Sequence, residues 1–348
     1  MILICACAAG RHDLVSEMNW GLLGHDWAVN LLKQQIARDA VRHAYLFTGP
    51  PGVGRRTLAV RFARALECTQ PPAPGESCGT CRACQQIEDM VYPDLAVIQA
   101  ETEGGILKID QVREVNHSLS LKPYQSKYRV ALFLRFHEAN LNAQNALLKT
   151  LEEAPAYAIL ILTADNAEQL LPTIVSRCEI LRLRALPLEE VNSHLQKKGA
   201  APEDARLLAH LSNGRPGYAL RLLNDPDTLK SRTERLNDLQ RLMPATRVTK
   251  FAYAEKLARD KDNFRRVLLI WSSFFRDVLL TTSKADAPLA NVDRTEEIAA
   301  LAKRLSMQQA RRTVSDLEQA VERLEKNVNA RLLAEVILLD LPAATASR

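Results

Sequence analysis

The pattern of apolar and polar positions along this chain changes character after about residue 186. Before that point, short runs made almost wholly of apolar residues alternate with longer segments whose apolar residues recur every three or four positions. Runs of the first kind are typical of strands buried on both faces, and segments of the second kind are typical of amphipathic helices. The predicted strands are 44–47, 94–99, 128–136, 158–163 and 179–183. Their alternation with helices predicts a parallel α/β sheet.

Helical spacing accounts for the segments between the strands and for the rest of the chain. In the first half the predicted helices are 20–41, 57–66, 110–119 and 142–153, the third with Asp110 as its N-terminal cap. Strand signals stop after residue 187. From there a helix is predicted over 188–222, interrupted at 214–217, and the suitable segments from about 225 to the end are predicted to be helical, including 263–280 and 327–341. In the last of these, one face is apolar and carries Val328, Leu332, Val336 and Leu339.

The predicted fold class is therefore α/β followed by all-α. A chain of 348 residues is long enough for two or three domains. We expect a parallel-sheet domain over 18–186, a small helical domain over 187–224 and a larger helical domain over 225–348. Residues 1–17 are left out of the predicted fold, because we expect them to be disordered or to precede a true start at Met18. They lack the basic segment that begins a signal peptide.

Composition narrows the class of protein without identifying it. Apolar residues make up 47% of the chain and charged residues 25%, which is ordinary for a soluble globular protein. No apolar run reaches the roughly 18 residues that span a bilayer, so we expect no membrane contact and a cytoplasmic location. The net charge of +5, from 46 basic and 41 acidic residues, permits contact with nucleic acid but does not demonstrate it.

A glycine-rich segment lies between the strand 44–47 and the helix 57–66. It reads Gly-Pro-Pro-Gly-Val-Gly, and Gly49, Gly52 and Gly54 occupy the positions of a phosphate-binding loop. In the pattern G-x-x-x-x-G-K-[S/T], backbone N–H groups cradle phosphates, the Lys neutralises them and the hydroxyl holds magnesium. Strand, glycine loop and helix form the context that this motif requires.

Both chemical residues of that motif are replaced. Arg55 stands where the Lys belongs, Arg56 stands where the hydroxyl belongs, and Thr57 lies one position late. A guanidinium cannot ligate magnesium and is bulkier than an ammonium group. Two interpretations stay open: a glycine turn without a ligand, or residual nucleotide binding through backbone amides and the helix N-terminus. ATP binding is accordingly an open question at this stage.

A second catalytic element is also altered. Working ATPases of this type end a buried strand with two acids, one for magnesium and one to activate water. Here the strand that contains Val130–Leu134 runs into Arg135, so a cation replaces the magnesium ligand, and Glu138 follows several residues later. Two losses in one apparatus argue against ATP hydrolysis by this chain alone.

Four of the seven cysteines lie within a stretch of 17 residues. Cys68, Cys78, Cys81 and Cys84 follow the spacing C-x9-C-x2-C-x2-C in a loop rich in Pro, Gly and Ser. Four thiolates suit tetrahedral zinc, and a full set of protein ligands would make that zinc structural. The alternatives are two local disulfides or free thiols.

The segment 171–178, Leu-Pro-Thr-Ile-Val-Ser-Arg-Cys, leads into the last predicted strand. An arginine held at the end of a short helix can project into a neighbouring subunit's nucleotide site. There it can stabilise the charge that develops on the γ-phosphate. Arg177 is our candidate for such an arginine finger. The alternative is an ordinary salt-bridged arginine, and Cys178 is interpreted as a small core residue.

Together, these residues resemble the clamp-loader branch of the AAA+ superfamily. The resemblance covers most of the chain from Met18, and its most specific stretches are 43–54, 145–153 and 171–178. It implies an AAA+ P-loop domain with a zinc insertion at about 68–84, followed by a helical lid and a helical collar that serves oligomerisation.

The resemblance also implies partners. Complexes of this family open a ring-shaped sliding clamp and place it on primed DNA during replication. We therefore expect ATP-hydrolysing motor subunits of the tau/gamma type and a delta subunit as partners, with indirect contact to the clamp and with DNA inside the complex. This chain would be a non-hydrolysing member that supplies Arg177 to a neighbour, and polymerase activity would belong to the holoenzyme.

Two other functions stay open from the sequence. The first is an active clamp-loader ATPase that uses Arg55 in place of the Lys. It predicts magnesium-dependent ATP turnover by this chain with a partner and DNA. The second is a stand-alone zinc-containing DNA-binding protein, which predicts tight, salt-sensitive DNA binding. The modest net charge argues against the second function.

Overall fold

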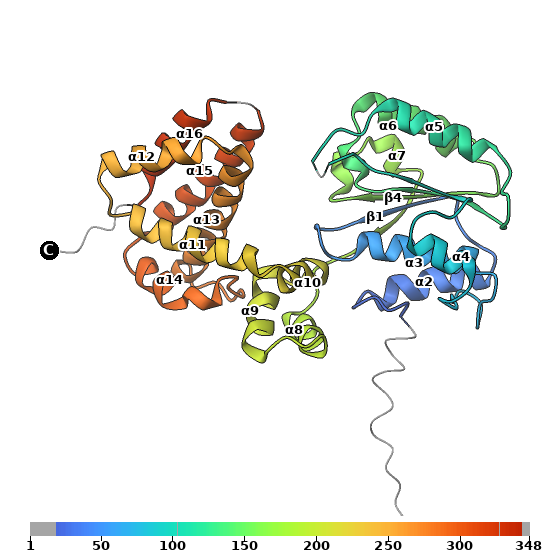
Figure 1. Ribbon diagram of the computed structural model, residues 1–348, viewed down its shortest axis with the longest axis horizontal. Coiled ribbons are helices and arrows are strands. Elements are labelled where there is room, and N and C mark those ends of the chain that lie inside the picture. Colours follow the sequence, from blue (N-terminus) through green and yellow to red (C-terminus); the bar gives the residue numbers. More distant parts are fainter. Residues whose placement is uncertain (1–18, 103, 327, 343–348) are drawn as a thin grey trace, which may run out of the picture. The chain divides into compact units, whose positions relative to one another are not determined.

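The structure is a computed structural model that describes residues 19–102, 104–326 and 328–342 (Figure 1). The chain divides into two compact units. The first comprises the described residues up to Glu190 together with Arg215–Tyr218, and the second comprises Val191–Gly214 and the residues from Ala219 onward. The expectation for residues 1–17 falls outside the described part. Among the residues described, no helix combines the length and apolar character needed to cross a bilayer.

The first unit is built on a five-stranded sheet in the order β2-β3-β4-β1-β5. Every pairing is parallel, and Leu46 of β1 lies opposite Leu162 of β4 and Ile180 of β5. The strands are β1 (Ala44–Thr48), β2 (Leu95–Ile98), β3 (Arg129–Phe133), β4 (Ala158–Ala164) and β5 (Glu179–Arg182). All residues of β1 and β4 are buried, as their continuous apolar runs predict. The parallel α/β sheet expected from the sequence is confirmed.

Helices cover both faces of this sheet (Figure 1). One layer contains α2 (Asp26–Ala37), α3 (Arg55–Glu67) and α4 (Arg82–Glu88), and the other contains α5 (Ile109–Ser120), α6 (Leu141–Glu152) and α7 (Pro172–Val175). Because side chains alternate along a strand, Tyr45 and Phe47 belong to the core on the α3 side, whereas Leu46 belongs to the opposite core. The ring of Phe62 from α3 packs edge-on against Tyr45, with 4.9 Å between centroids.

Three predicted boundaries in this unit are wrong. β3 ends at Phe133 rather than at 136, because Arg135 has φ 52° and a short 3-10 helix, η1 (Phe136–Glu138), follows it. Asp110 does not cap α5, because the extended residue Lys108 precedes the helix and its N–H is bound by the side chain of Gln111. α2 begins at Asp26 rather than near residue 20, since Gly21, Gly24 and His25 all have positive φ.

The second unit is helical throughout its described residues, as the sequence predicts. Its helices are α8 (Leu188–Lys197), α9 (Pro202–Ser212), α10 (Pro216–Asn224), α11 (Pro226–Leu242), α12 (Arg247–Leu257), α13 (Lys261–Thr282), α14 (Thr295–Ala302), α15 (Met307–Glu325) and α16 (Ala330–Asp340). The first residues of α8 and of α10 belong to the other unit. Its core is organised around α13, whose Trp271, Phe274 and Phe275 are completely buried.

The apolar stripe of α16 faces outward. Leu332 is 58% exposed, and Val328, Val336 and Leu339 are each more than 40% exposed. The core is filled instead by the neighbouring face of the same helix, which carries Leu333, Ala334, Ile337 and Leu338. Val248 and Phe251 on the adjoining α12 are exposed as well. We call the six exposed residues Val248, Phe251, Val328, Leu332, Val336 and Leu339 the collar patch.

Candidate phosphate loop, metal centre and arginine finger

The glycine loop between β1 and α3 depends on residues without a Cβ. Gly49 has φ 146°, and a Cβ there would lie 2.3 Å from the carbonyl oxygen of Leu183. Gly52 has φ 83°, and a Cβ there would lie 2.8 Å from the backbone nitrogen of Tyr218. Gly52 also accepts a hydrogen bond of 2.8 Å from the N–H of Gly217. The loop therefore requires glycine at these two positions, and residues 217–218 lie against its middle.

Arg55, in the place of the motif's lysine, is bound by a carboxylate of this same chain. It is the first residue of α3 and is 9% exposed. Its Nη2 donates to Oδ1 of Asp165 at 2.6 Å. The backbone oxygen of Asp165 also accepts from the N–H of Gly49 at 3.1 Å. Asp165 thus connects Gly49, where the loop begins, to Arg55, which follows the loop.

Sequence reasoning missed Asp165. The usable signal was its position directly after the buried strand β4, because carboxyl ends of neighbouring parallel strands meet at one edge of a sheet. The missing piece was the strand order, which places β4 next to β1.

The two residues after Arg55, which are Arg56 and Thr57, do not supply the magnesium ligand of the motif. Arg56 is exposed, and its Nη2 donates to the sulfur of Met90 at 3.4 Å. Thr57 is exposed on the first turn of α3. Neither residue places a hydroxyl at the position that follows the motif's lysine.

The turn after β3 pairs its charges internally. Nε of Arg135 donates to Oε1 of Glu138 at 2.9 Å, and the N–H of Gly104 donates to the same oxygen at 2.8 Å. His137 lies nearby, with Nε2 3.8 Å from Oδ1 of Asp165. Burial lowers the pKa of His137, so its imidazole is mainly neutral near pH 7. The turn after β3 thus presents a guanidinium that is paired with a carboxylate of the same turn.

A hollow of about 430 Å³ lies where β1, β4 and β5 end. It is lined by residues 48–50, 165–168 and 182–185, so Asp165 and Glu168 contribute to its wall along with Arg182 and Arg184. The hollow and the glycine loop share Gly49 and Pro50.

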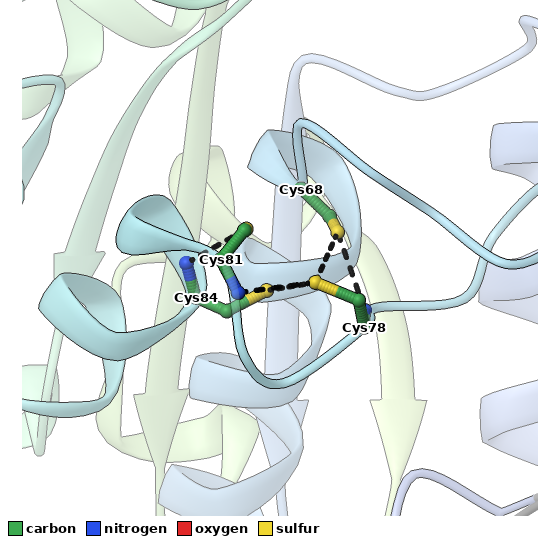
Figure 2. A group of neighbouring side chains, drawn as sticks. All are labelled: Cys68, Cys78, Cys81 and Cys84. Atoms are coloured by element: carbon green, nitrogen blue, oxygen red, sulfur yellow. Dashed lines mark hydrogen bonds between the residues drawn. The ribbon is translucent and has the colours of Figure 1, made fainter.

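The four clustered cysteines converge on one point (Figure 2). Their sulfurs all lie within 4.8 Å of one another, with 3.6 Å between Cys68 and Cys78 and 3.9 Å between Cys78 and Cys84. Tetrahedral zinc with Zn–S bonds of about 2.3 Å would separate its sulfurs by about 3.8 Å. All four are free thiols in this arrangement, and they could hold a metal ion.

Local structure explains how the cysteines come together. Cys68 follows the last residue of α3, Cys81 is the N-terminal cap of α4, and Cys84 lies one turn into α4. Backbone N–H groups of Cys78, Cys81 and Cys84 donate to sulfurs of the cluster. Such donors favour the thiolate form that metals require. The donor set therefore fits a soft divalent ion.

Arg177 follows α7 and is partly exposed. Its Nη1 donates to the carbonyl oxygen of Thr173 at 2.8 Å, and its Nη2 donates to Oε1 of Glu152 at 2.6 Å. Glu152 is the last residue of α6, and its side chain is half exposed. The guanidinium is thus held near the surface by an exposed acid that the sequence did not single out.

Fold and site together define a class of protein. A parallel sheet with a glycine loop between β1 and α3, followed by a helical region, is the AAA+ architecture of the clamp-loader type. The family model described as DNA polymerase III, delta subunit matches residues 24–187, and the model for the C-terminal part of that subunit matches residues 226–342. The chain belongs to this family.

Its curated relatives include both delta' and tau/gamma subunits of DNA polymerase III. The chain is 27% identical to the delta' subunit of Bacillus subtilis over 317 residues, which are 90% of this chain and 94% of that one. It is 37% identical to the delta' subunit of Pseudomonas aeruginosa over 204 residues, 57% of this chain and 61% of the other. The tau/gamma subunit of Haemophilus influenzae is 33% identical over 174 residues, 50% of this chain and 25% of the relative.

Proposed function

We propose that this chain is a non-hydrolysing clamp-loader subunit of the delta' type, and that it supplies Arg177 to the ATP site of a neighbouring motor subunit. In this role it helps a complex load the sliding clamp on primed DNA during replication. The observation that carries the proposal is the pairing of Arg55 with Asp165 inside an otherwise well-formed glycine loop.

Absence of ATP turnover by this chain follows from the charges around the loop. Hydrolysis needs a magnesium ion held by a hydroxyl and an acid, together with a group that orients water. The chain offers Arg56 in place of the hydroxyl and Arg135 in place of the acid, and the Glu138 carboxylate is engaged by Arg135. A guanidinium cannot ligate magnesium, so neither Arg56 nor Arg135 supplies the ligand that the reaction needs.

Arg177 is suited to act in trans. Its position directly after a short helix fixes its backbone, while a side chain 35% exposed leaves the guanidinium accessible. Its pair with Glu152 is solvated, and exposed pairs of this kind contribute little stability. A phosphate offers a guanidinium more charge and a bidentate geometry, so exchange of partner is favourable in an assembled site.

The collar patch supports assembly with the tau/gamma-type motor and delta subunits. Large apolar side chains on α12, on α16 and just before α16 are exposed in the isolated chain, and α12 contacts α16. Exposed apolar patches mark interaction sites. Contact with the sliding clamp would be indirect, and primed DNA would be met within the complex. The proposed location is the cytoplasm.

The cysteine cluster is proposed to hold structural zinc. Four protein thiolates complete the coordination shell, so such a zinc would have no open position for a catalytic water. It would brace the loop between α3 and α4, which is also tied to its surroundings by Arg64. The Arg64 guanidinium contacts Ser77 in the loop and Glu88 at the end of α4.

The decisive experiment is DNA-stimulated ATP hydrolysis by the reconstituted complex with Arg177→Ala. If one motor site uses this arginine, turnover falls by about that site's share, or further if the sites fire in order. The matched control is Arg113→Ala, an exposed arginine on α5 whose guanidinium pairs with the exposed Asp110. Unchanged turnover by an intact Arg177→Ala complex would remove the arginine finger from the proposal.

A further inference from the structure

We propose that the carboxylate of Asp165 takes the place of a bound anion at the glycine loop. This carboxylate holds the Arg55 guanidinium and thereby masks a latent anion site formed by that guanidinium and the N-terminus of α3. The inference rests on the proposed function, since it concerns the loop that this function leaves without catalytic use.

The geometry gives Asp165 two attachments to the loop. Its side chain accepts from Arg55, and its backbone oxygen accepts from Gly49. A third bond, from the N–H of Gly217 to the oxygen of Gly52, holds the middle of the loop. The loop is thus fixed at its start, middle and end by groups of this chain, with no nucleotide needed to order it.

Arg55 supplies the independent sign of an anion site. Its side chain is more than nine-tenths buried, and its Nη1 is buried without a hydrogen-bond partner among the described residues. A buried guanidinium with an unused donor is ready to accept further negative charge. It lies at the first position of a helix of 13 residues, where backbone N–H groups also favour anions.

Asp165 opposes that binding in two ways. A phosphate must compete with the carboxylate for Nη2 of Arg55, and it must approach a like charge at the start of the loop. Removal of the Asp165 charge reverses both effects. The uncovered site would take pyrophosphate or the phosphates of a nucleotide. It would do so without magnesium, because Arg56 stands where the metal-binding hydroxyl belongs.

The experiment measures binding of pyrophosphate, and separately of ATP, to the full chain by isothermal titration calorimetry in EDTA. The unaltered chain is expected to show no binding at submillimolar concentrations. Asp165→Asn is expected to bind each ligand at least about tenfold more tightly, because its buried Arg55 is left without a counter-ion. Added magnesium is expected to change the Asp165→Asn affinity for pyrophosphate less than twofold, after correction for magnesium–pyrophosphate complexes.

Two further variants test whether the Asp165 charge and the Arg55 guanidinium cause this gain in affinity. Glu168→Gln removes a carboxylate that lines the same hollow, and it should bind no better than the unaltered chain. Asp165→Asn combined with Arg55→Gln should lose the gain, because the guanidinium is gone. An equal gain in Glu168→Gln would attribute the effect to general charge and overturn the proposal. Tight binding by the unaltered chain would overturn it too.

Folding of the Asp165 variants is also informative. If Asp165→Asn unfolds in buffer, millimolar pyrophosphate is expected to restore its far-UV circular dichroism, since a ligand that binds the folded state stabilises it. A folded variant without binding, or an unfolded one that pyrophosphate does not restore, contradicts the proposal. Neither result touches the Arg177 experiment, because that one measures turnover at motor sites in the complex.

Discussion

Asp94 is the most completely buried charged residue that the structure describes in the first unit, and a short local network of donors surrounds it. The backbone N–H groups of Tyr124 and Gln125 donate to its two oxygens at 2.7 and 2.8 Å, and the hydroxyl of Ser126 donates at 3.0 Å. These donors and the nearby Arg129 guanidinium hold the pKa of Asp94 below its usual value. The carboxylate therefore fixes the turn that leads from α5 into β3.

We expect Asp94→Asn to lower the free energy of unfolding by about 2–4 kcal/mol at pH 7, because an amide cannot accept from all these donors. A folded pKa below the unfolded value stabilises above pH ~4, and this contribution is lost as the pH falls through the folded pKa. The difference between the two proteins should therefore shrink below about pH 4. Urea unfolding followed by circular dichroism measures it.

The control for this prediction is Asp110→Asn, whose carboxylate is 85% exposed. It should change stability by less than about 0.5 kcal/mol. A difference between Asp94→Asn and the unaltered chain that stays constant from pH 7 to pH 3 would contradict the argument.

For single residues, the sequence predicted which side chains occupy the glycine loop but not which other side chains of the chain they contact. The glycines and the two replacing arginines followed from the motif alone. Asp165, Glu152 and the Asp94 network depend on which strand or helix end lies nearby, and the alternation of apolar residues contains no such information. The predicted cap at Asp110 was wrong because the extended residue Lys108 occupies the cap position, so Asp110 already lies inside the first turn of α5.

Among the elements, the segment between α3 and α4 is the one on which the proposed zinc would act. We expect one zinc per chain by elemental analysis. Removal with a chelator under reducing conditions should lower the melting temperature by at least about 5 °C, because ligand binding to the folded state is lost. Cys84→Ser should lose the metal, whereas Cys178→Ser, outside the cluster, should retain it. Purified chain without metal, or an unchanged melting temperature after chelation, would argue for free thiols or disulfides.

The pattern of apolar residues predicted an element correctly where both of its faces lie in the same environment, either buried or exposed. The runs 44–47 and 158–163 are buried on both sides, and β1 and β4 appear where expected. β3 ended early because Arg135 takes a left-handed backbone conformation, which hydrophobicity does not report. In α16 two adjoining faces are both apolar, so the pattern could not tell that Leu333 faces the core and Leu332 faces solvent.

For the whole molecule, the collar patch is the surface most open to a test. Leu332→Glu places a charge on its most exposed α16 residue, which should weaken assembly with motor subunits by at least about tenfold. The melting temperature of the isolated chain should stay within about 2 °C, because Leu332 makes no part of the core. Gel filtration and surface plasmon resonance with reconstituted partners measure the effect.

Val91→Glu is the matched control for this surface. Val91 is 66% exposed and belongs to the first unit, whereas α12 and α16 belong to the second. Assembly that is equally impaired by both variants would indicate a general effect of added negative charge. Assembly unaffected by Leu332→Glu would remove α16 from the interface.

The Arg55–Asp165 pair also bears on how such a chain can change over generations. Under the proposed function, ATP hydrolysis by such a chain would require a lysine at position 55, a hydroxyl at position 56 and an acid at position 135, and a carboxylate at 165 would still compete for the new lysine. Several of these steps bring no gain until the others are present, and loss of Asp165 first leaves a buried charge unpaired. If the chain is the non-hydrolysing subunit proposed above, ATP hydrolysis is therefore difficult to regain, and selection acts on the chain mainly through its role in the assembled complex.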